Sequence, residues 1–115
     1  MDEREFNAMA DAMLARIEEA LENCAVDFDY DIQPGGVIEL EFEHAGGSKI
    51  VINRHTVARE IWIAAKSGGY HFRASAADSN HPQRWLGTRD GVELLTQLSR
   101  CMSEQAGVEV VLANH

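Results

Sequence analysis

Carboxylates are concentrated in the first 32 residues of this 115-residue chain. That stretch has ten acids against two bases, a net charge of −8, whereas the remainder has nine acids against eight bases, a net charge of −1. Carboxylate oxygens are ligands for hard cations such as iron, manganese, calcium and magnesium, and they also attract basic protein surfaces. The sequence therefore predicts a surface that binds a metal ion or a basic patch on a partner.

Two neighbouring elements must position these carboxylates. Apolar residues recur at three- and four-residue steps through the opening segment and predict a helix with one buried stripe: Phe6, Ala10, Met13, Ile17 and Leu21. At about 100° per residue, Asp11, Glu18 and Glu22 fall within roughly 40° of one another, away from the stripe. Glu19 lies on the adjacent flank of the same helix.

A strand is predicted to follow this helix. The segment DFDYDI alternates, with Phe28, Tyr30 and Ile32 on one face and Asp27, Asp29 and Asp31 on the other. If the strand lies close to the helix, both sets of carboxylates could form one continuous ridge. The alternative is a solvated edge strand whose charges prevent sheet-to-sheet aggregation.

Several other functions find no support in the sequence. A calcium loop opening at Asp27 requires Gly at its sixth position and Glu at its twelfth, where this chain has Ile32 and Ile38. Phosphate-loop, dinucleotide-binding and nucleophile motifs are absent, so we expect no enzyme, and the acidic balance argues against nucleic acid. No apolar run suits a membrane span, and the acidic start resembles neither a signal nor a transit peptide, so we expect a cytoplasmic protein.

The remaining pattern predicts a single α+β domain over residues 1–115. Short alternating runs separated by turn signals follow the first strand (VIELEFEH, KIVINR, EIWIAAK, YHFRAS and RWLG). A closing helix is predicted from the capping-box spacing of Asp90 and Glu93 to a stop at Gly107. We therefore expect a two-layer sandwich with both helices on one face of a five- or six-stranded antiparallel sheet.

One tryptophan is a candidate binding anchor. If Ile61 and Ile63 face the core, Trp62 lies on the opposite face of the sheet, toward water. Exposed tryptophan is enriched at interface hot spots. The alternative is an indole that neighbouring side chains partly cover.

The segment INRHTVAREIWIAAKSGGYHF, with Arg73 after it, resembles the signature of the frataxin family. In that family an Asn-Arg-Gln turn, a tryptophan strand and a Lys-x-Gly-Gly-Tyr-His-Phe hairpin occur in this order. The acidic helix, the acidic strand, the GGV at residues 35–37, the tryptophan-containing sixth strand and the closing helix agree as well. The resemblance covers nearly the whole chain and is closest to the short bacterial members (the CyaY type), which lack a targeting extension.

The resemblance implies an iron-binding protein that regulates iron–sulfur cluster assembly. It implies weak, exchangeable binding of Fe2+ and Fe3+, docking on the cysteine desulfurase and the iron–sulfur scaffold protein, and a monomer when iron-free. Carried over by position, the implied metal-binding residues are Asp11, Glu18, Glu19, Glu22, Asp27, Asp29 and Asp31. The implied partner-binding residues are Glu18, Glu19, Glu22, Asn53, Arg54 and Trp62.

The chain departs from the family pattern at a few positions. His55 replaces the usual Gln, Val57 replaces a common Pro, and residues 23–25 occupy a stretch that is often acidic. The alternative function is a metal-independent acidic interaction module, such as an inhibitor or an immunity-type factor. An iron-oxidising or storage enzyme is weaker, since ferritin-like sites pair carboxylates with His inside a helix bundle.

Overall fold

Six strands in chain order form the larger layer of the fold. The computed structural model describes residues 2–24, 28–75 and 84–112. The strands pair antiparallel with their sequence neighbours, in the order β1-β2-β3-β4-β5-β6. Their bounds are β1 (Asp29–Gln33), β2 (Val37–Phe42), β3 (Ser48–His55), β4 (Glu60–Ala65), β5 (Gly68–Ala74) and β6 (Trp85–Gly87), with the short helix η1 (His44–Gly46) between β2 and β3. The predicted meander is confirmed.

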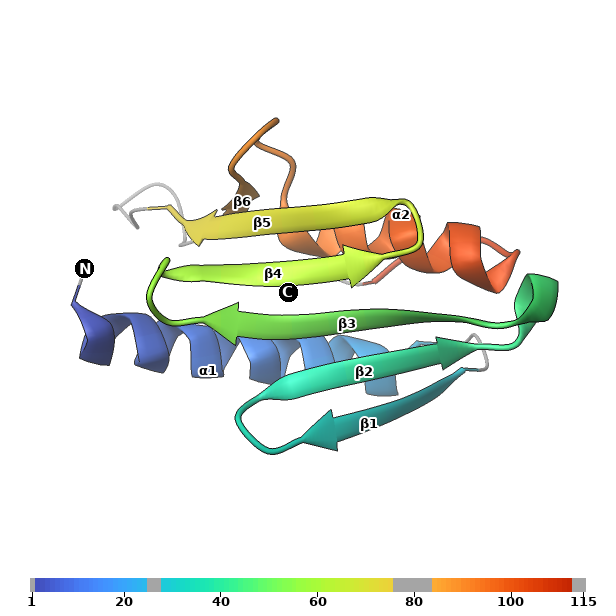
Figure 1. The fold of residues 1–115 in the computed structure, drawn as a ribbon, viewed down its shortest axis with the longest axis horizontal. Coiled ribbons are helices and arrows are strands. Elements are labelled where there is room, and N and C mark those ends of the chain that lie inside the picture. The colour runs from blue at the N-terminus through green and yellow to red at the C-terminus, as the bar shows by residue number, and fades with distance from the viewer. Residues whose placement is uncertain (1, 25–27, 76–83, 113–115) are drawn as a thin grey trace.

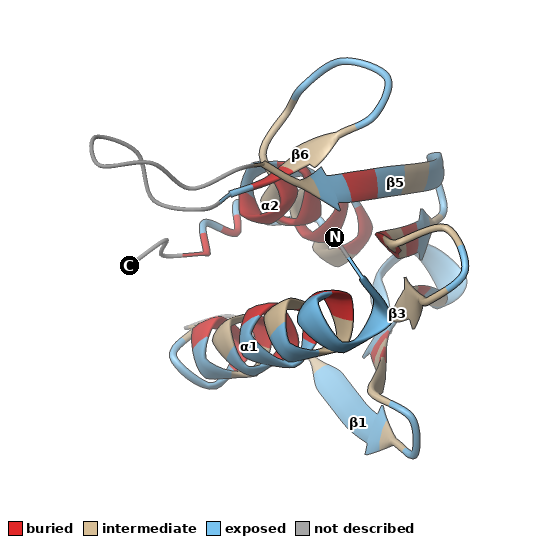
Figure 2. Ribbon diagram, turned by 90° about the vertical axis from the view of Figure 1, so that its left-hand side faces the viewer, coloured by how far each residue is buried: buried red, intermediate tan, exposed pale blue. Residues whose placement is uncertain are grey.

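Two helices form the other layer. The helix α1 (Glu3–Glu22) begins at Asp2, whose side chain accepts a hydrogen bond from the backbone N–H of Glu5 at 2.8 Å. The predicted stripe of this helix is confirmed, because all five of its apolar residues are buried. Figures 1 and 2 show α1 and α2 (Leu94–Ala106) side by side on one face of the sheet. The predicted α+β sandwich is therefore confirmed.

Alternation along the strands decides which side chains meet the helices. In β2, Ile38, Leu40 and Phe42 are buried, whereas Glu39 and Glu41 lie on the opposite face. The buried face continues through β3, β4 and β5 with Ile50, Ile52, Ile61, Ile63 and Phe72. We call the other side of the sheet, which no described helix covers, the open face.

The start of α2 differs from the prediction. Glu93, predicted at the third position of a capping box, is itself the N-cap, and its carboxylate accepts from the N–H of Thr96 at 3.0 Å. Asp90 instead accepts from the N–H of Val92 at 3.1 Å, which stabilises the preceding turn. The predicted stop is confirmed, since Gly107 adopts the left-handed conformation with φ 73°.

The segment after α2 packs back onto this helix. The Ser103 hydroxyl accepts from the N–H of Val110 at 2.8 Å, and that of Ser99 accepts from the N–H of Leu112 at 3.0 Å. Val110 and Leu112 are buried, so this segment extends the core. Neither helix in the described residues is long and apolar enough to cross a membrane.

Candidate functional site

The helix contributes three carboxylates that the sequence predicted. Glu19 and Glu22 are exposed, and Glu18 is half-buried. Within residues 2–24, 28–75 and 84–112, none of the three makes an ion pair. Their negative charge therefore stays available to a cation or a basic partner surface.

The fourth predicted helix carboxylate is already paired. Asp11 forms an ion pair with the guanidinium of Arg54, which also donates to the backbone and side-chain oxygens of Asn7, both at 3.4 Å. The Arg54 side chain is only 18% exposed and ties β3 to α1. Asp11 therefore contributes less free charge than its neighbours, and Arg54 lies on the helix side of the sheet.

The strand carboxylates lie on the open face. Asp29 is in register with Glu41, and Asp31 with Glu39. Tyr30 points to the helix side, in register with Leu40, yet remains 38% exposed because β1 extends past α1. Asp27, also predicted as a ligand, lies outside the described residues.

These register pairs add two residues that the predicted site lacked. We call Asp29, Asp31, Glu39 and Glu41 the open-face carboxylate cluster. Its one cationic neighbour among the described residues is Lys49, whose Nζ lies 3.0 Å from Glu39 and 3.3 Å from Glu41. A hydrogen bond and attraction from Lys49 lower the pKa of Glu39, and the same contacts raise the pKa of Lys49. The alternation in VIELEFEH, combined with antiparallel pairing across the turn at Pro34, would have predicted that Glu39 and Glu41 lie opposite Asp31 and Asp29.

The structure does not bring helix and strand carboxylates into one cluster. The helix set lies on the side of the sheet that α1 covers, and the strand set lies on the open face. In the described part of the chain, no group of three His, Cys, Asp or Glu side chains could hold a metal ion. The oxygen donors suit a hard cation, but the geometry offers pairs of carboxylates and no closed coordination shell.

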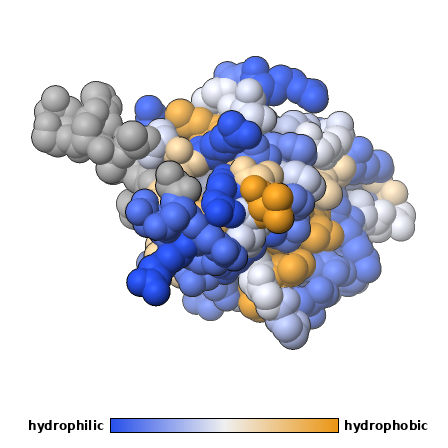
Figure 3. Space-filling model, turned by 60° about the vertical axis from the view of Figure 1, so that its left-hand side comes forward, coloured by the Kyte–Doolittle hydropathy of each residue, from blue (hydrophilic) through white to orange (hydrophobic). Residues whose placement is uncertain are grey.

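In the described part of the chain, large exposed hydrophobic residues lie on β1, in the turn after β3 and in the segment after α2. They are Tyr30, Ile32, Val57, Val108 and Val111. Figure 3 shows a mainly hydrophilic surface interrupted by separate hydrophobic residues.

The open face carries a second group of functional candidates over β3, β4 and β5. Trp62 is in register with Asn53 on one side and His71 on the other, so these three side chains share the open face. Arg54, which the resemblance assigned to the same surface, does not join them. Trp62 is half-buried, and therefore the alternative of a partly covered indole holds.

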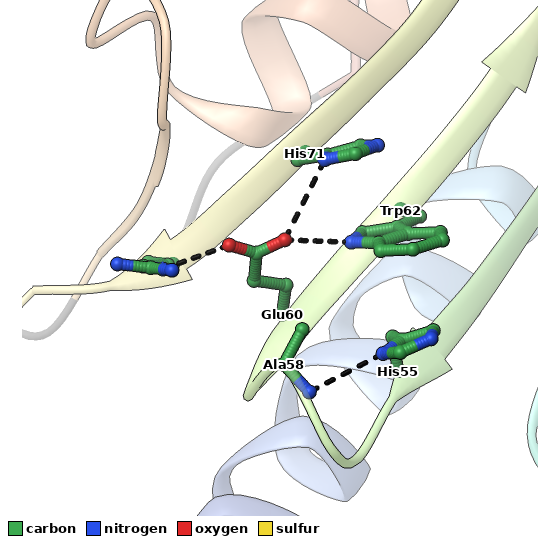
Figure 4. A network of polar contacts seen from close by, with 6 residues as sticks. His55, Ala58, Glu60, Trp62 and His71 are labelled. Atoms are coloured by element: carbon green, nitrogen blue, oxygen red, sulfur yellow. Dashed lines mark hydrogen bonds and ion pairs between the residues drawn. The ribbon is translucent and has the colours of Figure 1, made fainter.

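Two imidazole rings cover the two faces of this indole (Figure 4). The ring of His55 lies 4.1 Å from that of Trp62 at an interplanar angle of 13°, and the ring of His71 lies 4.2 Å away at 8°. We call these three residues the histidine–tryptophan stack. Sequence reasoning missed it, although the alternation of β3, β4 and β5 puts all three residues on one face.

A buried carboxylate supports the stack. Glu60 is 6% exposed, and its Oε1 accepts from Trp62 Nε1 at 2.7 Å while its Oε2 accepts from Arg73 Nε at 2.8 Å. Burial alone would raise the pKa of Glu60, but the hydrogen bonds from Trp62 and Arg73 and the attraction of Arg73 and His71 together lower it. Glu60 is therefore charged at neutral pH and fixes the edge of the indole.

Comparison with known proteins finds relatives that match nearly the whole chain. Residues 1–108 match the frataxin-like domain. The chain is 51% identical over 112 residues to the iron–sulfur cluster assembly protein CyaY of Dechloromonas aromatica (strain RCB), which covers 97% of this chain and 99% of that protein. It is 44% identical over 115 residues to the CyaY of Janthinobacterium sp. (strain Marseille), with 97% and 96% covered. The solved structure of frataxin from Psychromonas ingrahamii superposes with a TM-score of 0.79 at 32% identity, covering 99% of this chain and 100% of that one.

Proposed function

This chain belongs to the frataxin-like family, and from this membership we propose that it acts in iron–sulfur cluster assembly in the bacterial cytoplasm. Its role is regulatory and non-catalytic, exerted by weak iron binding and by docking on the cysteine desulfurase and scaffold complex. The carboxylates of α1 and β1 that make no ion pair among the described residues are the observation that carries this proposal.

Iron is a cargo held by carboxylates at this edge of the sheet. Asp29 opposite Glu41 and Asp31 opposite Glu39 are like-charged cross-strand pairs, and Lys49 pairs only with the two glutamates. A bound cation would relieve the repulsion that remains. Two carboxylates leave most of the coordination shell to water, so binding is weak and exchangeable. In this proposal Asp27 and the helix residues Glu18, Glu19 and Glu22 are further negative groups that raise the local concentration of the cation.

Docking uses the helix carboxylates and the open face. Glu18, Glu19 and Glu22 present uncompensated charge to a basic patch on the desulfurase, which speeds encounter and fixes orientation. Asn53 and Trp62 lie on the open face and contact the scaffold protein. Arg54 supports this surface only indirectly, through its contacts with α1.

A charge-reversal variant tests the docking. We expect Glu18→Lys, Glu19→Lys and Glu22→Lys together to weaken desulfurase binding at physiological salt by at least about tenfold. The matched control is Asp29→Asn with Asp31→Asn, which removes charge from the other side of the sheet and should weaken iron binding more than docking. Undiminished desulfurase binding by the triple variant would contradict the proposed docking surface.

The second candidate function is a metal-independent acidic interaction module. The separation of helix and strand carboxylates favours it, because the described residues contain no group that could hold a metal on its own. Anaerobic titration with Fe2+ discriminates between the two. Line broadening in NMR confined to residues 11–31 and 39–41 supports iron binding, and unchanged spectra favour the module.

A further inference from the structure

The indole of Trp62 is enclosed by two imidazoles, and we propose that proton uptake at one of them, His55, opens the histidine–tryptophan stack and weakens docking on the open face. The switch is a property of the isolated chain. Only the identity of the docking partner rests on the proposed function.

The stack leaves one part of the indole accessible. Imidazole rings cover both of its faces, and its N–H is bonded to Glu60 (Figure 4). A partner can therefore reach only the outer edge of the ring, which carries partial positive charge. This edge fits an apolar side chain or a backbone carbonyl oxygen of the partner, and it excludes recognition of a Lys or Arg stacked on the ring.

The two imidazoles respond differently to a proton. The backbone N–H of Ala58 donates to His55 Nδ1 at 3.2 Å, so this nitrogen carries a lone pair and no proton. A proton on the same atom would set two N–H groups against each other, and the hydrogen bond to Ala58 would be lost. In contrast, Nδ1 of His71 lies 3.5 Å from Glu60 Oε1, so a proton there is attracted to the carboxylate and the ring keeps its place.

The charges around His55 do not hold a proton on Nδ1. Glu60 is directly opposite His55 in register, but Trp62 and Arg73 already occupy its two oxygens and Arg73 balances its charge. Within the turn that follows β3, Arg59 is cationic, and His71 lies beyond the indole. Among the described residues, no uncompensated anion therefore faces His55 from β3, β4, β5 or this turn.

Apart from the bond to His55, the hydrogen bonds of the described residues that hold this turn share one acceptor, Thr56 O, which also accepts from the Arg59 guanidinium. The N–H of Arg59 donates to Thr56 O at 3.2 Å, and Arg59 itself lies in the left-handed region at φ 57°. Such a conformation is unfavourable for a residue with a side chain and persists only where neighbouring bonds hold it. Loss of the Ala58 hydrogen bond should therefore loosen the turn, release the His55 ring and uncover one face of the indole.

Chemical shifts of the Ala58 amide test this directly in the isolated chain. Between pH 8 and 5.5 we expect the Ala58 N–H and the Trp62 indole N–H to shift in one common step. His55→Gln keeps an oxygen acceptor for Ala58 but cannot titrate, so the step should vanish, whereas in the matched variant His71→Gln it should persist. Nitrogen shifts of the His55 ring in the unsubstituted chain report the same event without any variant. An Ala58 signal that does not move, or one that moves equally in His55→Gln, overturns the switch.

Binding to the purified desulfurase–scaffold complex completes the test. We expect affinity at pH 6 to be at least about threefold weaker than at pH 8, and this ratio to fall toward one in His55→Gln. Equal ratios for both chains contradict the effect on docking. Absence of binding at both pH values contradicts the proposed partner instead, and the Ala58 titration then decides the switch alone.

Discussion

Arg54 on β3 pairs with Asp11 on α1 and so joins an interior strand of the sheet to the helix. Two residues to which the family resemblance assigned separate functions, metal binding and partner docking, therefore neutralise each other. Arg54 Nε is also buried without a hydrogen-bond partner in the described residues. The ion pair and the contacts with Asn7 offset the loss of hydration that this burial imposes.

Replacing Arg54 with Lys should destabilise the fold by about 1–3 kcal/mol. A single ammonium cannot reach Asp11 and both oxygens of Asn7 at once. Urea unfolding measures the change. The control Asp11→Asn should cost less, because the Asp11 side chain is 67% exposed. Equal losses for the two variants would show that the contacts with Asn7 contribute nothing.

Two adjacent glycines in the β1–β2 turn should respond differently to alanine. Both have positive φ, 86° at Gly35 and 78° at Gly36, so each substitution carries a backbone penalty of about 1 kcal/mol. A Cβ on Gly36 would also lie 2.9 Å from Arg54 Nη2 and 3.1 Å from Leu14 Cδ1, whereas one on Gly35 meets nothing within 4 Å. Gly36→Ala should therefore be less stable than Gly35→Ala by about 1 kcal/mol in thermal unfolding. Equal midpoints would show that the Arg54 side chain moves aside freely.

Glu60→Gln should change the pH dependence of stability. The pKa of Glu60 is lowered in the folded chain, so its charge stabilises the fold above the ordinary value of 4.5, and this contribution is lost as the pH falls through the lowered pKa. We expect a loss of about 1 kcal/mol at pH 7, because Arg73 is largely exposed and water screens the pair. The difference between the two chains should shrink in unfolding curves taken below pH 4.5. A constant difference across this range would contradict a charged Glu60.

Lys49→Met should strengthen cation binding at the open-face carboxylate cluster. Without this ammonium, Glu39 and Glu41 lose their counter-charge beside Asp29 and Asp31. Affinity for Mn2+, followed by paramagnetic broadening of the β1 and β2 amide signals, should rise by about threefold or more. Lys66→Met removes an exposed lysine outside the cluster and is the matched control. If both variants bind Mn2+ alike, net charge and not this cluster governs binding.

Periodicity predicted most of the fold, and the errors have identifiable causes. The stripe from Phe6 to Leu21 and the alternation of β2 could be predicted because each element buries only one side, so its apolar residues recur at a fixed spacing in the sequence. The start of α2 was missed because the Asp90 carboxylate is used in a turn and Glu93, a less usual residue for that position, forms the cap.

The site was harder to predict than the fold. Arg54 was grouped with Asn53 and Trp62, although neighbouring residues in a strand point to opposite faces. Alternation alone would have separated them. The burial of Glu60 could not be anticipated in this way, since it depends on three partners from β4 and β5 that close over it.

The serial order of the strands has a consequence for the speed of folding. Each strand pairs with the one before it, so the sheet can assemble from hairpins whose loops close over short stretches of chain. Docking of α1 is different, because its contact with β3 joins residues far apart in the chain, as the 43-residue separation of Asp11 and Arg54 illustrates. Helix docking should therefore be the late event on the folding pathway, after the β1–β2 hairpin has brought the open-face carboxylate cluster together.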